Sequence, residues 1–76
     1  MNNNIKVYPN PVSNQLMVAS NIDMSSIQIF SLEGRLVKQV LDNMSIDMSD
    51  LPANQYIVKI ITKEGVLMKR VVKVND

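Results

Sequence analysis

The sequence predicts an all-β protein, because short apolar runs recur along it at spacings near ten residues. Proline, asparagine, aspartate and glycine fill the gaps between the runs, and no segment keeps a 3.6-residue apolar period over the length of a helix. Ile, Val, Leu and Met supply most of the apolar side chains, which suits thin packed sheets. The pattern therefore indicates a small immunoglobulin-like antiparallel β-sandwich of about seven strands, with residues 1–76 forming a single domain.

Seven runs are expected to be the strands. They cover residues 5–7, 15–20, 26–30, 35–41, 44–48, 55–61 and 66–74. In the fifth run Met44, Ile46 and Met48 alternate with polar residues, so all three are expected to face the core. The fourth run does not keep a strict two-residue period, and this indicates either a β-bulge or a strand buried on both faces.

Residues that favour turns mark the boundaries of these strands. Those predicted to have structural roles are Tyr8, Pro9, Asn10, Pro11, Gly34, Leu51, Pro52, Asn54 and Gly65. The two early prolines end the first strand in a rigid turn, because proline lacks an amide donor and restricts the residue before it. Gly34 supplies the positive φ of a tight hairpin, so the third and fourth strands are expected to be antiparallel neighbours.

Composition excludes several classes of function. A formal net charge of +1 argues against nucleic-acid binding, which normally needs a larger and clustered excess of Lys and Arg. No run approaches the roughly 20 apolar residues of a membrane-spanning helix, and the first four residues lack the features of an export signal. If the domain works outside the cytoplasm, we therefore expect it to be a fragment of a longer secreted protein.

Catalytic and metal-binding residue sets are also missing from the sequence. The chain has no His, no Cys and no glycine-rich phosphate loop, so we expect no enzyme activity and no cofactor. Asp42, Asp47 and Asp50 lack the dense ligand spacing of a calcium-binding loop, and turn caps or solvated strand faces explain them better. Function must then come from a surface or a terminus.

The last strand is the strongest candidate for a recognition element. Its residues are Lys69, Arg70, Val71, Val72, Lys73 and Val74. The three cations would present charge while the valines favour pairing with a receptor strand. Charges on an edge strand also prevent aggregation, and the two roles are compatible. Met17, Ile57 and Ile61 lie opposite the clearest core positions, and an exposed patch there, or the edge strands, would favour weak self-association.

The order of these motifs resembles the type A C-terminal sorting domain of the type IX (Por) secretion system. The segments that carry the resemblance are Val7-Tyr8-Pro9-Asn10-Pro11-Val12 followed by Leu16 and Val18, Ile27-Gln28-Ile29-Phe30, Leu32-Glu33-Gly34-Arg35-Leu36-Val37, Ile46 to Ala53, Tyr56 to Ile60 and the terminal Lys69-Arg70-Val71-Val72-Lys73. The chain differs from the family pattern at Asn54, where glycine is usual, and asparagine is the residue that best tolerates a left-handed φ in its place.

The resemblance implies a non-catalytic sorting signal. It would direct a covalently attached N-terminal cargo through the periplasm and across the outer membrane, to the cell surface or the extracellular space. The implied partners are outer-membrane components of the type IX translocon and a sortase-like cysteine peptidase, which usually cleaves the domain off. The alternative is a generic immunoglobulin-like accessory or carbohydrate-binding spacer module of a cell-surface protein.

Overall fold

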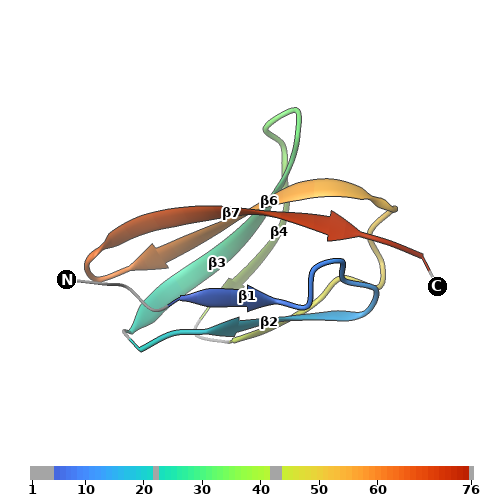
Figure 1. Ribbon diagram of the computed structural model, residues 1–76. Coiled ribbons are helices and arrows are strands. Elements are labelled where there is room, and N and C mark those ends of the chain that lie inside the picture. Colours follow the sequence, from blue (N-terminus) through green and yellow to red (C-terminus); the bar gives the residue numbers. More distant parts are fainter. Residues whose placement is uncertain (1–4, 22, 42–43, 76) are drawn as a thin grey trace.

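Two antiparallel sheets packed face to face form the molecule (Figure 1). The computed structural model describes residues 5–21, 23–41 and 44–75. Their strands are β1 (Lys6–Tyr8), β2 (Gln15–Ala19), β3 (Met24–Ser31), β4 (Leu36–Leu41), β5 (Ser45–Asp47), β6 (Asn54–Thr62) and β7 (Gly65–Lys73). The small sheet has the order β1-β2-β5 and the large sheet β4-β3-β6-β7. The predicted all-β sandwich of seven strands is confirmed.

The position of β4 distinguishes this sandwich from the constant-type immunoglobulin arrangement, in which the fourth strand joins the sheet of the first two. Here β4 pairs with β3 in the large sheet, as the hairpin at Gly34 predicts. Gly34 has a φ of 91°, and its amide donates to the Ser31 carbonyl over 3.0 Å. Gly65 has a φ of 141° at the β6–β7 hairpin. Glycine therefore supplies the backbone freedom that both turns need.

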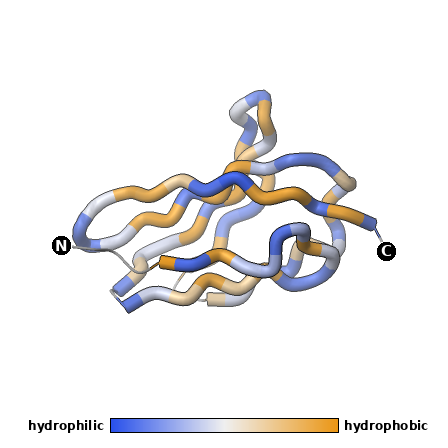
Figure 2. Tube along the Cα trace, viewed as in Figure 1, coloured by the Kyte–Doolittle hydropathy of each residue, from blue (hydrophilic) through white to orange (hydrophobic). Residues whose placement is uncertain are grey.

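The core lies between the sheets and is built by strand alternation. Leu16 and Val18 of β2 face Ile27 and Ile29 of β3, all at most 2% exposed. The alternation of apolar and polar segments along the strands is visible in Figure 2. Twelve apolar residues are buried within the described part of the chain: Ile5, Val12, Leu16, Val18, Ile27, Ile29, Ile46, Met48, Tyr56, Val58, Ile60 and Val71.

The irregular fourth run is a β-bulge. Lys38 is paired with Ile29 and Leu36 with Phe30, so Val37 is the extra residue on β4. The strand is not buried on both faces, because its residues are partly or fully exposed. The sequence pattern left both alternatives open, and the pairing register decides between them.

Two expectations about apolar side chains need revision. Met44 was expected in the core, but it is 44% exposed, because β5 begins only at Ser45 and strand alternation does not extend back to Met44. Its carbonyl nevertheless accepts a hydrogen bond from the Val18 amide over 2.8 Å. Met17, Ile57 and Ile61 are only half-exposed, so they form less open apolar surface than the sequence indicated.

The corner before β6 is fixed by a buried tyrosine. Tyr56 is 4% exposed, and its hydroxyl donates to the Pro52 carbonyl over 2.7 Å. A tyrosine at the start of the sixth strand that bonds back to the preceding corner is a recurrent feature of immunoglobulin-like sandwiches. Asn54 begins β6, and its side-chain oxygen accepts the Gln55 amide over 2.8 Å. This geometry gives the Leu51-Pro52 motif a structural role.

Replacing this tyrosine with phenylalanine tests the corner. Tyr56→Phe keeps the ring but leaves the Pro52 carbonyl without its partner, so we expect a loss of about 1–2 kcal/mol in the free energy of unfolding, measured by urea denaturation. Tyr8→Phe is the matched control, because the Tyr8 side chain is 48% exposed. Equal unfolding midpoints for both variants would contradict the structural role of the corner.

The stability of Tyr56→Phe should also depend less on alkaline pH than the stability of the parent chain. Burial, reinforced by the negative charge of Glu33, raises the pKa of Tyr56 above its ordinary value of 10.0. The unfolded chain therefore loses this proton first, so the stability from neutral Tyr56 is complete below pH 10 and declines as the pH rises further. Urea midpoints between neutral pH and pH 11 should fall less steeply for Tyr56→Phe than for the parent chain.

Candidate functional site

The turn near the start of the chain lies directly against its last strand. The side chain of Asn10 accepts a hydrogen bond from the Val72 amide over 2.9 Å and donates one to the Arg70 carbonyl over 3.3 Å. Asn10 therefore occupies the place of a neighbouring strand. Both flanking prolines follow cis peptide bonds. The two terminal motifs that stand out in the sequence are thus parts of one structure.

Val12 completes this junction with main-chain bonds. It forms a parallel bridge with Lys73, in which its amide donates to the Val72 carbonyl over 2.8 Å and its carbonyl accepts the Val74 amide over 2.9 Å. The Val12 side chain is fully buried. Sequence reasoning missed this contact, because one valine between two turns has no periodic pattern of its own. We call the pairing of residues 10–12 with residues 70–74 the terminal seam.

The terminal seam divides the outer edge of β7 into two halves. The main-chain amides and carbonyls that bond to residues 10–12 belong to Arg70, Val72 and Val74. Because main-chain groups alternate in direction along a strand, the even-numbered residues of β7 point these groups away from β6. The uninterrupted β6–β7 register places the amides and carbonyls of Val66 and Met68 on the same side. Within the described residues these groups have no hydrogen-bond partner. We call them, together with the Arg70 amide, the open edge.

The six predicted recognition residues differ in exposure. Lys69 and Arg70 are exposed and Val72 is 37% exposed, whereas Val71 belongs to the core and Val74 is half-buried. Lys73 was expected to present its charge, but the residue is only 3% exposed, because strand alternation turns it inward together with Val71. Its Nζ donates to the Asn75 side chain over 3.0 Å. Lys73 therefore anchors the end of the chain.

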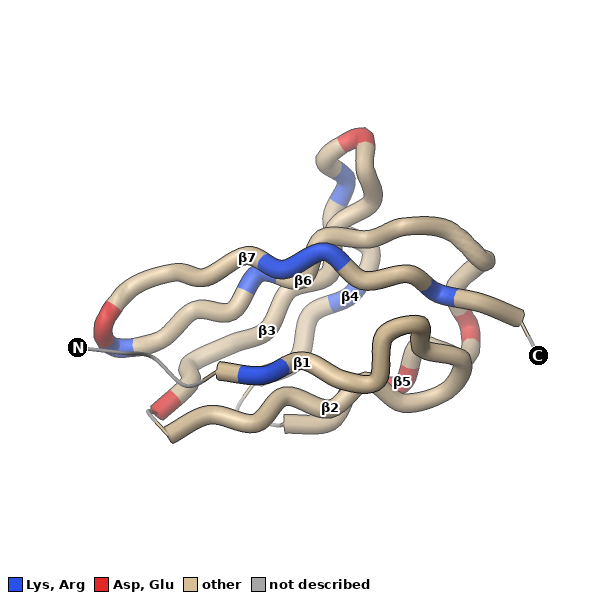
Figure 3. The backbone as a smooth tube through the Cα atoms, in the orientation of Figure 1, with Lys and Arg blue, Asp and Glu red and all other residues tan. Residues whose placement is uncertain are grey.

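A groove separates the middle of β7, at residues 69–71, from β1. It has a volume of about 420 Å³ and is lined by residues 5–8 and 69–71 together with Asn10. Lys6, Lys69 and Arg70 are its charged residues, and no carboxylate lines it. Lys6 begins β1, and Lys69 and Arg70 lie in the middle of β7. Figure 3 shows basic segments at these places, with acidic residues at the ends of strands. None of the three forms an ion pair with another described residue.

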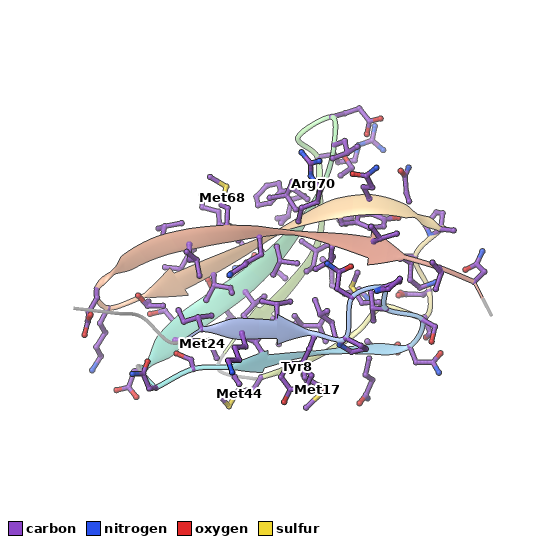
Figure 4. All side chains as sticks on the ribbon, viewed as in Figure 1. Tyr8, Met17, Met24, Met44, Met68 and Arg70 are labelled. Atoms are coloured by element: carbon purple, nitrogen blue, oxygen red, sulfur yellow. The ribbon has the colours of Figure 1, made fainter. Side chains whose placement is uncertain are left out.

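Side chains on the two outer faces differ in character. Arg70 and Met68 point outward from the large sheet, whereas Tyr8, Met17 and Met44 lie on the opposite side of the molecule (Figure 4). Tyr8 is paired with Met17 across β1 and β2. Exposed apolar side chains therefore occur on both faces, whereas three of the cations without an ion pair in the described structure, Lys6, Lys69 and Arg70, line the groove.

The acidic residues near β5 have structural partners. Asp47 accepts hydrogen bonds from the amide and hydroxyl of Ser49, which hold the pKa of its carboxyl below the ordinary value. Asp50 lies 2.7 Å from the Lys38 ammonium, which lowers the pKa of that carboxyl too. Asp42 lies outside the described residues. In the described ranges no group of three potential metal ligands is gathered, and no helix is long and apolar enough to cross a membrane.

Comparison with known families gives one match. Residues 6–74 match a family model described as "Secretion system C-terminal sorting domain". The match spans every strand, the terminal seam and all of the groove residues except Ile5. It confirms the resemblance noted in the sequence to sorting domains of the type IX system. A search of the curated proteins gave no significant match.

Removing the Asn10 side chain tests the terminal seam. Asn10→Ala deletes two hydrogen bonds to β7, so we expect a loss of about 1 kcal/mol in unfolding free energy and faster hydrogen exchange at the Val72 amide. Asn14→Ala is the matched control, because no hydrogen bond involves the Asn14 side chain in the described structure. Unchanged exchange at Val72 in Asn10→Ala would show that the seam does not protect β7.

Two lysines of β7 should respond differently to truncation. Lys73→Ala removes a buried side chain and should lower the unfolding free energy by about 1–2 kcal/mol. Lys69→Ala removes an exposed one and should change it by less than about 0.5 kcal/mol. Urea denaturation measures both. A larger effect at Lys69 would contradict the assignment of Lys73 as the structural lysine.

Proposed function

This chain belongs to the family of secretion system C-terminal sorting domains, and we propose that it directs an attached cargo across the outer membrane through the type IX pathway. The family match over residues 6–74 is the observation that supports this function most strongly. As a sorting domain, the chain is associated with a cargo protein and with secretion to the outer membrane, cell surface or extracellular space.

The proposal also covers the steps of export. The domain forms the C-terminal part of a longer protein that first reaches the periplasm, where components of the outer-membrane translocon bind it. A sortase-like cysteine peptidase then cleaves the domain from the cargo. The domain itself acts as substrate and address, a role that agrees with the non-catalytic character of its family.

The exposure of the β7 side chains limits which of them a receptor could contact without unfolding the domain. Lys69, Arg70 and Val72 are accessible, whereas Val71 and Lys73 are buried. Deleting the whole segment would remove core packing as well as charge, and a domain of this size has little stability to lose. Exposed side chains are therefore the appropriate targets for mutation.

A reporter fusion tests the proposed function. Residues 1–76 are placed behind a periplasm-directed reporter in a bacterium that has the type IX system. We expect the reporter outside the outer membrane, with its molecular mass reduced by loss of the domain. Retention in the periplasm, or equal release by a strain without the translocon, would refute the sorting role.

Charge reversal identifies the contacted residues. The double variant Lys69→Glu with Arg70→Glu should reduce export at least several-fold while the domain stays folded, since both side chains are exposed. Lys63→Glu with Arg35→Glu is the charge-matched control, because both residues are exposed and lie outside the groove. Equal export of the two variants would show that net charge, and not the β7 cations, governs recognition.

A further inference from the structure

The groove meets the open edge of β7 at Arg70 and is bordered on its other side by β1. Among the residues that the structure describes, β7 pairs only with β6 along its first half, and β1 pairs only with β2. The main-chain groups of Val66, Met68 and the Arg70 amide therefore offer a row of donors and acceptors without a described partner. An unpaired strand edge of this kind can accept an added strand.

The terminal seam determines where such a strand can bind. Residues 10–12 already form hydrogen bonds with the outer edge of β7 from the Arg70 carbonyl to the Val74 amide. An incoming strand would therefore have to pair with residues 66–70. This segment lies nearer the start of β7 than the six-residue motif that the sequence singles out, and it overlaps that motif only at Lys69 and Arg70.

Charge defines the chemistry of the partner. Lys69 and Arg70 follow each other on β7, so their side chains leave opposite faces of the strand. Arg70 points outward (Figure 4). Lys69 lies on the same face of β7 as the buried Val71 and Lys73, and it lines the groove. Lys6 lies across the groove on β1. A strand beside β7 would meet cations on both of its faces, and opposite charges stabilise cross-strand pairs.

We propose that an acidic, extended segment of a partner protein adds to the open edge of β7 and contacts the groove at Lys69 and Arg70. This deepens the proposed function, because it names the kind of receptor strand that would read a sorting domain. The inference itself rests on edge geometry and charge. A second copy of this chain would bring the same cations to the edge, so an acidic partner strand fits better.

A designed peptide probes the site directly. A peptide of alternating Glu and Val is titrated into the isotope-labelled 76-residue chain, and amide shifts are followed by NMR. We expect shifts at Val66, Met68 and Arg70 and weaker binding at high salt. A Lys-Val peptide of equal length is the control. Shifts located elsewhere, or equal binding of the two peptides, would overturn the proposal.

A proline substitution tests strand addition separately from charge. Met68→Pro removes an amide that points away from β6, so the β6–β7 ladder keeps its bonds while the partner loses a donor. We expect at least about a tenfold loss of peptide affinity, whereas Met68→Leu keeps the amide and the affinity. Urea denaturation confirms folding. Should Met68→Pro prove unfolded, Lys69→Glu replaces it, with roughly a threefold loss expected from one cross-strand charge pair. Unchanged affinity in the folded variant would refute the proposal.

Two further measurements separate the alternatives. Sedimentation of the chain alone should give a concentration-independent monomer, and a dimer abolished by Met68→Pro would assign the edge to a second copy and overturn the acidic partner. The reporter fusion is run with Met68→Pro and Met68→Leu. Peptide binding without export of the parent fusion would refute the proposed function alone, whereas normal export without peptide binding would refute only this inference.

Discussion

The fold depends on the contact between the two ends of the chain. Residues 10–12 leave the small sheet after β1 and bind the outer edge of the large sheet at residues 70–74. This crossing ties the sheets together on one side, and Val12 contributes a fully buried side chain to the core. On another side Lys38 of β4 bonds to the Asp47 carbonyl and to Asp50. In the described ranges no strand of one sheet pairs with a strand of the other, so the turn at residues 10–12 and the Lys38 side chain close the sandwich.

The same contact gives the last strand two different halves. Where residues 10–12 cover it, β7 is a structural element with Val71 and Lys73 turned inward. Where nothing in the described structure covers it, β7 exposes main-chain groups and carries two adjacent cations. Charges on an open edge discourage pairing with unselected strands. They also favour a partner of opposite charge, so protection and selective recognition follow from one arrangement.

The sequence predicts local features well and long-range contacts poorly. Gly34 and Gly65 mark their hairpins because a positive φ is a local requirement, and alternation identifies Leu16, Ile27 and Ile29 as core residues. In the sequence, the bulge at Val37 appears only as an interruption of the two-residue apolar alternation, and the pairing of β4 with β3 is needed to assign it. Lys73 is turned inward by alternation with Val71, although its charge favours an exposed position in the sequence. The role of Val12 depends on a contact about 60 residues apart in the chain, for which this valine has no local pattern.

This contact also bears on how a terminal sequence can serve as a sorting signal. A linear motif would be read equally well in a folded or an unfolded chain, but only some residues of this one are accessible in the folded domain. Asn10 bonds to Arg70 and Val72, so a segment near the start of the domain holds the second half of β7 in its strand conformation. A receptor that pairs with β7 would then bind only after the start of the domain has folded against its end. Recognition would be coupled to completed folding, because the terminal seam requires both ends of the chain.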